Sequence, residues 1–476
     1  MTKLFRPRRD GSAKDLPEAV RHCCDAIETL AEASFRSYYQ TMPGDLLIHE
    51  LGPKGDGVHR SQGGAVYVDR ALPGDRVQAT IRRGDDGVLR GDLLKIIKAS
   101  PHRVKAPCPN YEVCGGCTLQ HAKDEFYRHW KLDIVRDALR GKGLKPRIWR
   151  DPVFLPAGDR RRATFIAHKK NNIVILGHTR RRAHQVTDIA SCLVADPALM
   201  EMRARLTLLL APILQEGKPA AAFIQAVDGQ FDIVITGPVG KTGKPDAATR
   251  QAITLFARAS NVSRIGWRAD QDDPVEVIIE ISPLRARFGD LDVILPPLAF
   301  LQPTQAGEHA LVDAVMELLP RAGNFADLFS GCGTFTGPML GRGAVDAYES
   351  VGPAIRALDK AKGTRPLKAI RRDLFRNPLR RDEANRYDAI VFDPPRAGAQ
   401  EQARNLASSR IPLLVGVSCN PATFARDARI LVDGGYRLDS VRVVDQFTWS
   451  HHVELVAGFT KRSDRPRSKS RSPNDR

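Results

Sequence analysis

The sequence contains no run of about 18 uncharged apolar residues, so it has no segment able to cross a membrane as a helix. Its N-terminus is basic and lacks the apolar core of a secretory signal peptide. No internal repeat is visible either. These absences exclude a chain that spans a membrane by helices, and they make the cytoplasm the expected compartment.

Acidic residues are scarce relative to basic ones. Asp and Glu number 55 against 73 Lys and Arg, which gives a formal net charge of +18. A basic excess of this kind commonly serves a polyanion, because each neutralised phosphate releases counterions. The alternative is a charged surface that only keeps the protein soluble. We expect a nucleic-acid partner.

Cysteine is also sparse. Eight cysteines in 476 residues exclude a disulfide scaffold. Three of them are clustered at Cys108, Cys114 and Cys117, and Cys192 lies further along the chain. In a cytoplasmic protein a tight cysteine cluster more often binds metal or serves catalysis. Four thiolates suit a [4Fe–4S] cluster, but zinc accepts the same ligands, and spacing alone does not separate the two.

The globular part of the chain divides into three predicted regions. Residues 42–100 contain short strand-like runs separated by glycine and proline turns, which is typical of a small OB-like barrel. Residues 101–290 mix helices with strands and carry the cysteine cluster. Residues 291–460 alternate strands and helices, which predicts a doubly wound α/β sheet with ligands at the carboxyl ends of its strands.

Both ends of the chain read differently from the middle. We expect residues 1–41 to be a poorly ordered extension, and Met42 to be the true start, because the first clear globular segment begins there. Residues 461–476 are charged and carry no large apolar side chain, which predicts a disordered basic tail.

A glycine-rich turn is predicted after a strand, in the segment from Asp327 to Gly331 and Gly333. Glycines let the backbone approach a ligand where side chains would clash. The spacing of Asp and the two glycines suits S-adenosylmethionine better than a dinucleotide. Glu349 ends the next predicted strand, where a carboxylate can accept both ribose hydroxyls. The alternative for the glycines alone is a structural turn.

A thiol and a carboxylate near the C-terminus predict covalent catalysis on a base. Position 5 of uracil is a poor nucleophile, but a thiolate that adds at position 6 converts the ring into an enolate. A base must later remove the proton from position 5. Cys419 follows an apolar run and suits the first task, and Glu454 suits the second. Alone, each would be read as a core thiol or a surface carboxylate; together with the loop Asp393-Pro-Pro-Arg396 they favour catalysis.

With these motifs, the chain resembles the RNA uracil-C5 methyltransferases, which form 5-methyluridine, and in particular the cluster-containing branch that acts on bacterial 23S ribosomal RNA. The resemblance runs from about residue 42 to residue 460. It rests on residues 393–396, on Ser-Cys-Asn-Pro at 418–421 and on the cysteine segment 108–121. It implies a C-terminal Rossmann-like methyltransferase domain, an N-terminal OB-like TRAM barrel that binds RNA, and a central α+β iron–sulfur domain.

The resemblance also implies roles for individual residues. Cys419 would be the nucleophile and Glu454 the base. The residues expected at the cofactor or the target uracil are Gln302, Phe329, Gly331, Thr334, Glu349, Asp373 and Asp393. The expected ligands of the [4Fe–4S] cluster are Cys108, Cys114, Cys117 and Cys192.

The expected partners follow from the same comparison. S-adenosyl-L-methionine would be the methyl donor and RNA the substrate. We favour 23S ribosomal RNA over transfer RNA, because the transfer-RNA branch generally lacks the cluster. A monomer is expected. The alternatives are the same chemistry on transfer RNA, and a non-catalytic RNA-binding or ribosome assembly factor.

Overall fold

The computed structural model describes residues 43–62, 64–181, 183 and 185–461. By their internal contacts they fall into two compact units, divided after Arg103. The expected N-terminal extension lies outside the described residues, and so does the expected tail apart from Lys461, which ends a strand. No helix among the described residues is long and apolar enough to span a membrane.

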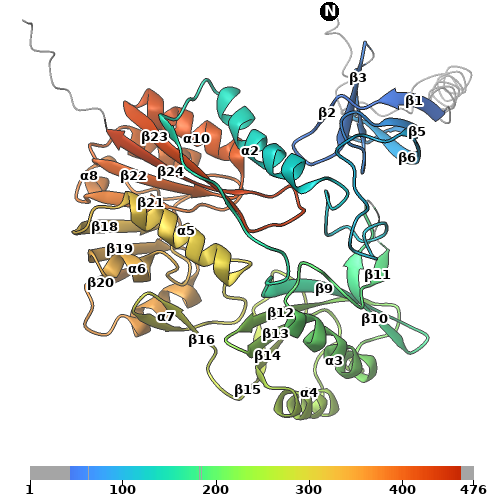
Figure 1. Ribbon diagram of the computed structural model, residues 1–476. Coiled ribbons are helices and arrows are strands. Elements are labelled where there is room, and N and C mark those ends of the chain that lie inside the picture. Colours follow the sequence, from blue (N-terminus) through green and yellow to red (C-terminus); the bar gives the residue numbers. More distant parts are fainter. Residues whose placement is uncertain (1–42, 63, 182, 184, 462–476) are drawn as a thin grey trace, which may run out of the picture. The chain divides into compact units, whose positions relative to one another are not determined.

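The described residues of the first unit form strands and no helix. The strands are β1 (Pro43–Leu47), β2 (Glu50–Leu51), β3 (Gly57–Ser61), β4 (Gly64–Val68), β5 (Arg76–Arg83) and β6 (Leu89–Lys98). They form one sheet in the order β1-β5-β6-β4-β3-β2, antiparallel except between β4 and β6 (Figure 1). Alternating side chains such as Val66 and Val68 face its small core. The OB-like TRAM assignment stays a prediction.

The second unit contains two large sheets, of which the first comes earlier in the chain. Its strands are β9 (Arg162–Lys170), β10 (Ile173–Thr179), β11 (Val186–Asp188), β12 (Pro219–Val227), β13 (Gln230–Thr236), β14 (Val262–Arg268) and β15 (Glu276–Glu280). Their order is β11-β10-β9-β12-β13-β14-β15. The helices α3 (Pro197–Ile213) and α4 (Ala247–Ala259) pack on it around one apolar core. A hairpin of β16 (Arg285–Phe288) and β17 (Leu291–Ile294) follows.

The later sheet has the expected alternation of strands and helices. Its strands are β18 (Gly323–Leu328), β19 (Gly343–Glu349), β20 (Leu367–Arg371), β21 (Ala389–Phe392), β22 (Leu413–Ser418), β23 (Tyr436–Asp445) and β24 (Glu454–Lys461), together with β7 (Ile148–Trp149) and β8 (Val153–Phe154). The order is β20-β19-β18-β21-β22-β24-β23-β7, and β8 also pairs with β23. The strands from β20 to β22 are parallel, whereas β24 runs antiparallel to both its neighbours.

Helices cover both faces of this sheet, as a doubly wound fold requires (Figure 1). They are α2 (Asp124–Arg140), α5 (Gln305–Leu318), α6 (Thr336–Leu340), α7 (Gly352–Ala361), α8 (Arg381–Ala384), α9 (Gln400–Ala407) and α10 (Pro421–Asp433). Consecutive residues of β22 serve opposite faces: Leu414 packs with α2, α9 and α10, and Val415 packs with α5, α6 and α7. Helix α2 and strands β7 and β8, which were expected in the central region, thus join the C-terminal sheet.

Candidate active site

The expected site residues gather at the carboxyl edge of the later sheet. The strand order reverses at β18, because β19 lies on one side of it and β21 on the other. Open α/β sheets bind ligands at such a switch point. Leu328 pairs with Phe392, and Phe392 pairs with Gly416, so the three segments that follow β18, β21 and β22 leave the sheet side by side.

The glycine turn after β18 has the backbone that its sequence requires. Gly331 and Gly333 have φ angles of 54° and 105°, and Phe329 has a φ angle of 65°. These angles lie in the left-handed region that favours glycine. A Cβ atom on Gly333 would lie 2.6 Å from Leu358 Cδ2, so this position excludes a side chain.

Glu349 binds this turn from the end of β19, where the sequence placed it. Its Oε2 accepts a hydrogen bond from Gly331 N at 3.1 Å, and its Oε1 accepts from Ser350 N at 2.6 Å and from Val351 N at 2.8 Å. Thr334 lies half-buried further along the turn. The arrangement places a carboxylate against the glycine turn at the switch point.

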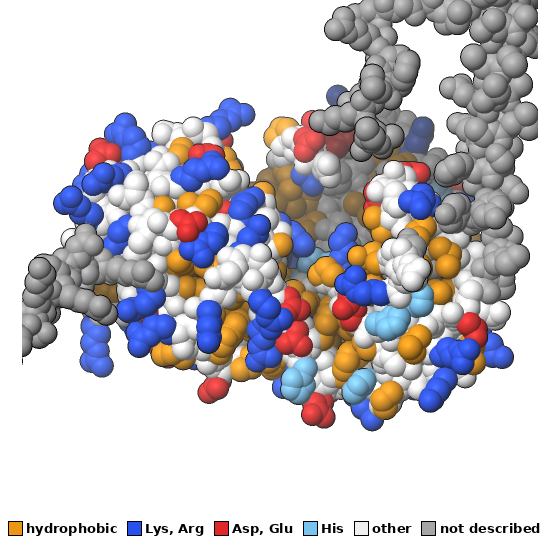
Figure 2. Space-filling model, turned by 90° about the horizontal axis from the view of Figure 1, so that it is seen from above, with side chains coloured by type: hydrophobic (Ala, Val, Ile, Leu, Met, Phe, Trp, Pro, Cys, Tyr) orange, Lys and Arg blue, Asp and Glu red, His pale blue; other side chains and the backbone are white. Residues whose placement is uncertain are grey.

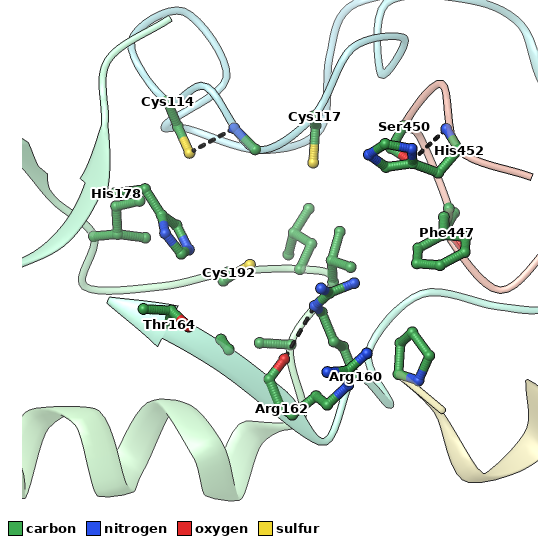
Figure 3. Close-up of a pocket in the computed structure, with 18 of the residues that line it drawn as sticks. Cys114, Cys117, Arg160, Arg162, Thr164, His178, Cys192, Phe447, Ser450 and His452 are labelled. Atoms are coloured by element: carbon green, nitrogen blue, oxygen red, sulfur yellow. Dashed lines mark hydrogen bonds between the residues drawn. The ribbon is translucent and has the colours of Figure 1, made fainter. Parts of the chain in front are cut away.

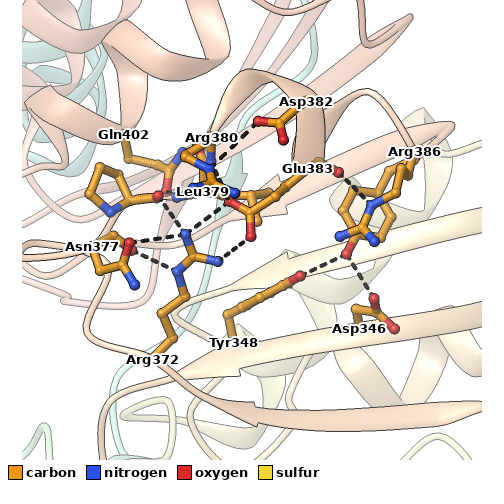
Figure 4. Close-up of polar contacts among 12 residues, drawn as sticks. Asp346, Tyr348, Arg372, Asn377, Leu379, Arg380, Asp382, Glu383, Arg386 and Gln402 are labelled. Atoms are coloured by element: carbon orange, nitrogen blue, oxygen red, sulfur yellow. Dashed lines mark hydrogen bonds and ion pairs between the residues drawn. The ribbon is translucent and has the colours of Figure 1, made fainter.

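The loop after β20 carries Asp373 and is held by Arg372 (Figure 4). The Arg372 guanidinium donates to both oxygens of Glu383, at 2.8 and 3.0 Å, and to the backbone oxygens of Asn377 and Pro378, each at 2.7 Å. These bonds join the start and the end of the loop, so its backbone has one geometry.

Within that loop Asp373 caps the turn that follows it. Its Oδ1 accepts from Phe375 N at 2.9 Å. The Phe375 ring is 49% exposed and lies 5.5 Å from the ring of Phe329, centroid to centroid. Two aromatic rings and a carboxylate thus border the edge of the glycine turn.

The residues expected to be catalytic line a cavity of about 490 Å³ in the second unit. Its wall includes Cys419, Glu454 and Gln302 together with the four clustered cysteines. Figure 3 shows Cys114, Cys117 and Cys192 around one end of this space and Phe447 and His452 at the other. Residues from distant parts of the sequence therefore share one cavity.

Strand register brings Cys419 and Glu454, the expected nucleophile and base, close together. Ser418 pairs with Leu455 in an antiparallel ladder, so the next residues outward, Cys419 and Glu454, are neighbours. The segment after Cys419 begins helix α10: Asn420 Oδ1 accepts from Ala422 N at 3.2 Å, and Pro421 occupies the first turn. Asn and Pro are favoured at these positions, and the positive end of the helix dipole therefore lies beside the thiol.

Gln446 fixes the base against Gln302. Its Nε2 donates to Gln302 Oε1 at 2.7 Å and to Glu454 Oε1 at 3.5 Å. All three side chains are buried. Thr304, two residues after Gln302, accepts a hydrogen bond from Gly307 N at 2.9 Å and so caps helix α5.

Burial raises the pKa values of the acidic groups of the site toward or above neutral pH. Desolvation, followed by the nearby carboxylates of Glu454 and Asp393, raises the pKa of the Cys419 thiol to about 12. Desolvation likewise raises the pKa of Asp393 and of Glu454 above their usual range, whereas the Arg396 guanidinium opposes the shift of Glu454. The thiol is therefore neutral at pH 7 in the free protein.

Arg396 reaches the site from the loop that follows β21. Its Nη1 donates to His452 Nδ1 at 2.7 Å, and its backbone oxygen accepts from Asn420 Nδ2 at 2.8 Å. Burial lowers the pKa of His452 to about 3. A neutral imidazole accepts this hydrogen bond, so His452 orients Arg396 and is not charged at neutral pH.

The four clustered cysteines lie together in the cavity wall. Cys108, Cys114, Cys117 and Cys192 all line it. Desolvation, with the neighbouring cysteines adding to it, raises the pKa of Cys117 to about 12. Among the described residues, no group of three or more His, Cys, Asp or Glu side chains is arranged to hold a single metal ion.

Several residues of the site had no signal of their own in the sequence. Gln446 and Phe447 stand in the loop after β23, and neither was predicted as a site residue. Arg162 was not predicted either, yet it lines the cavity from β9, 4.3 Å from the centroid of the Phe300 ring. Only strand pairing brings these side chains to the thiol.

A solved structure shows the same fold. The chain matches the tRNA (uracil-54, C5)-methyltransferase of Pyrococcus abyssi, solved in complex with S-adenosyl-L-homocysteine, with a TM-score of 0.69. The match covers 87% of this chain and 99% of that one at 24% sequence identity. The protein therefore has the fold of a methyltransferase.

Sequence relatives define the family. A protein of Brucella suis, named an uncharacterized RNA methyltransferase, is 38% identical over 88% of this chain and 98% of its own length. A Caulobacter vibrioides protein of the same name is 39% identical over 88% of this chain and 100% of its own. The 23S rRNA (uracil(1939)-C(5))-methyltransferase RlmD of Acinetobacter baumannii is 29% identical over 87% of this chain and 93% of its own.

The profile of the family described as tRNA (Uracil-5-)-methyltransferase matches residues 368–462. This chain thus belongs to a family of RNA methyltransferases, and the profile match near its C-terminus agrees with the uracil-5 branch that its motifs predicted.

Proposed function

We propose that the protein transfers a methyl group from S-adenosyl-L-methionine to C5 of a uracil in RNA, through a covalent bond between Cys419 and C6. The pairing of Cys419 with Glu454 in one cavity is the observation that carries the proposal. The target base has to leave its stack to reach this cavity. Gln302 and Arg396 also line it and supply hydrogen-bond partners for the edge of a uracil.

The proposed reaction consists of thiol addition, methyl transfer and elimination. The Cys419 sulfur bonds to C6, its proton passes to Asp393, and the electron pair of the C5–C6 double bond moves to O4. C5 then bonds to the methyl carbon, and S-adenosylhomocysteine leaves with the electron pair of the broken bond. Glu454 takes the proton from C5, the C6–S bond breaks, and the thiolate recovers its proton. We assign the first proton to Asp393 because Glu454 must be free for the second.

The proposed cofactor site is the carboxyl edge of β18 to β20. Glu349 would bind the ribose hydroxyls, Gly331 would admit the cofactor close to the backbone, and Asp373 would accept from the adenine. Phe329 and Thr334 would line the same pocket. The hydrogen bonds that fix Glu349 and the Asp373 loop support this placement.

We propose further that Cys108, Cys114, Cys117 and Cys192 hold a [4Fe–4S] cluster. The four thiols lie in one wall of the cavity. A single zinc ion needs all four sulfurs at about 2.3 Å from one point, an arrangement missing among the described residues. In a cluster each thiolate binds a different iron atom, so the four sulfurs need not converge on one point. Four thiolates leave no open iron site, so its role would be structural.

The substrate that we favour is 23S ribosomal RNA. The Acinetobacter baumannii relative is named for that substrate. The Pyrococcus abyssi structure and the matching family profile are named for transfer RNA, so transfer RNA is the alternative. The half-buried Cys419 beside the buried Glu454 argues against a factor that only binds RNA. The monomeric state and the cytoplasmic location stay predictions.

The first test identifies the product. Anaerobically purified protein is incubated with methyl-labelled S-adenosylmethionine and, separately, unmodified 23S ribosomal RNA and transfer RNA. We expect labelled 5-methyluridine from ribosomal RNA. The same nucleoside from transfer RNA would change the substrate and keep the chemistry. No label from either RNA would leave the binding-factor alternative.

Variants test the two catalytic roles. Cys419→Ala should abolish turnover and keep cofactor binding, because the thiol bonds only to the base. Glu454→Gln should transfer the methyl group and then remain bonded to RNA, because C5 keeps its proton. Glu401→Gln is the matched control, since this exposed carboxylate lies on α9 and outside the cavity wall. Absence of a denaturant-resistant adduct in Glu454→Gln would contradict the assigned base.

Metal analysis tests the cluster. We expect iron and acid-labile sulfide in nearly equal amounts, and their loss in Cys117→Ser but not in Cys332→Ser. Zinc in place of iron would overturn the assignment.

A further inference from the structure

A single loop carries residues that surround Glu454, the proposed catalytic base. It runs over residues 446–453, between the end of β23 and Glu454 at the start of β24. Gln446 at its beginning holds Glu454, and Phe447 and His452 line the cavity. The position of Glu454 therefore depends on how this loop is held.

Helix α2 holds the loop by hydrogen bonds from residues that do not line the cavity. Lys131 is fully buried, and its Nζ donates to Asp445 Oδ1 at 2.8 Å. The same ammonium donates to Phe447 O at 3.4 Å and to His452 O. One cation thus binds the residue before the loop and backbone oxygens near both of its ends.

Tyr127, one helical turn before Lys131, adds two hydrogen bonds to the same loop. Its hydroxyl donates to Asp445 Oδ2 and accepts from Trp449 N at 3.0 Å. The Tyr127 side chain is buried, and its hydroxyl contacts both Asp445 and the middle of the loop.

The segment that follows the cysteine cluster also hydrogen-bonds Trp449. Trp449 O accepts from Thr118 N at 2.7 Å and from Leu119 N at 3.0 Å, directly after Cys117. Trp449 has a φ of 61°, a conformation that costs energy for a residue other than glycine. The surrounding hydrogen bonds hold it there.

Apolar packing of the loop would not require a buried ion pair. Replacing a buried ion pair by apolar side chains of similar volume is often neutral or stabilising. A buried ion pair between Lys131 and Asp445 is nevertheless present here. Lys131 also donates hydrogen bonds to the backbone oxygens of Phe447 and His452 in the loop. Directional bonds fix where a loop lies, whereas apolar contacts mainly fix that it is buried.

We propose that Tyr127 and Lys131 are positioning residues for the methyl transfer, and that they act through Asp445 and Trp449 to hold the loop of Gln446 in the place where Glu454 can remove the C5 proton. The inference rests on the proposed function for its catalytic consequence. Its structural part, control of the loop by α2, is independent of that function.

The test compares two hydroxyl deletions. Tyr127→Phe removes the bonds to Asp445 and Trp449 and keeps the ring and the Lys131 ion pair. Tyr436→Phe is the matched control. Tyr436 is equally buried at the other end of β23, and its hydroxyl bonds Ser409 Oγ at 2.9 Å and Ile411 O at 3.1 Å, away from the loop.

Two readouts are taken on the full chain. Amide exchange followed by mass spectrometry reports on peptides that cover residues 446–453. Single-turnover reactions with RNA and S-adenosylmethionine report the fraction of protein bonded to RNA. For Tyr127→Phe we expect about tenfold faster exchange of the loop. We also expect accumulation of the covalent adduct and unchanged cofactor affinity. Tyr436→Phe should show neither change at a similar melting temperature.

The outcomes separate the two proposals. Equal loop exchange in both variants would overturn the positioning role, whatever the activity. Faster exchange in Tyr127→Phe with unchanged adduct partition would overturn the catalytic part. If wild-type protein formed no 5-methyluridine on any RNA, the proposed function would fail, and the exchange comparison would still decide the role of α2.

Discussion

At the scale of single residues, burial sets the chemistry of the acidic groups. Asp327 lies in β18, and its side chain is fully buried. Its Oδ2 accepts from the Thr336 hydroxyl at 2.5 Å, and its Oδ1 has no hydrogen-bond partner among the described residues. Desolvation raises the pKa of this carboxyl to about 7, against a usual value of 3.8. The charged form is therefore costly in the folded protein.

The raised pKa predicts a dependence of stability on pH. A carboxyl that binds its proton more tightly when folded stabilises the protein fully below its unfolded pKa, and this stabilisation is lost as the pH rises toward about 7. Asp327→Asn should remove this dependence. Relative to wild type, the variant should gain on the order of 1 to 4 kcal/mol between pH 4 and pH 8.

Urea unfolding at the two pH values measures this difference. Asp272→Asn is the control, because Asp272 is exposed in a loop and its substitution should shift stability equally at both pH values. A difference between Asp327→Asn and wild type that did not change with pH would contradict the buried-acid interpretation.

At the scale of elements, short loops at strand ends carry the chemistry, and bonds behind them set their shape. Arg372 shows this most directly. It does not line the cavity, yet from the start of the loop that holds Asp373 it bonds the end of that loop (Figure 4). The glycine turn is shaped in the same way by Glu349.

This arrangement predicts an effect of Arg372→Met on cofactor binding. The substitution keeps the aliphatic stem and removes the bonds to Glu383 and the loop backbone. We expect S-adenosylmethionine to bind about tenfold more weakly, as measured by calorimetry, because the loop must be ordered on binding. Arg404→Met, which removes one exposed pair on α9, should leave the affinity unchanged. Equal losses in both variants would mean that the loop does not contact the cofactor.

At the scale of the whole molecule, positive charge prevails. Lys and Arg are more numerous than Asp and Glu over the face drawn in Figure 2, as they are in the sequence. A surface of this kind attracts RNA along its whole length, and the attraction weakens as salt screens it. In the first unit, Lys95 and Lys98 extend this charge along β6, where both are exposed.

The proposed role of the first unit in RNA binding predicts a salt effect. Lys95→Gln combined with Lys98→Gln should weaken RNA binding and lower the slope of log affinity against log salt by about 1 to 2. The control combines Lys241→Gln with Lys244→Gln, an exposed pair of the same spacing in the second unit. Filter binding over a range of salt concentrations measures both slopes. An unchanged slope for the first pair would place the RNA elsewhere.

Much of the fold was predictable because its signals are local. The strands that precede Phe329, Asp393 and Cys419 are apolar runs bounded by glycine or proline, and they were expected within a residue or two of where they lie. Asn420 and Pro421 mark a helix start for reasons that involve only their neighbours. The family, too, was evident from such short motifs.

The sequence by itself therefore determined the strands, the turns, the family and the two groups proposed for catalysis, since each is encoded by residues close together in the chain. Only the tertiary structure decided that Gln446 meets Gln302, that Arg396 meets His452, and that β7, β8 and α2 join the C-terminal sheet. These contacts join residues far apart in sequence. They follow from strand order and packing, for which a single sequence carries no periodic signal.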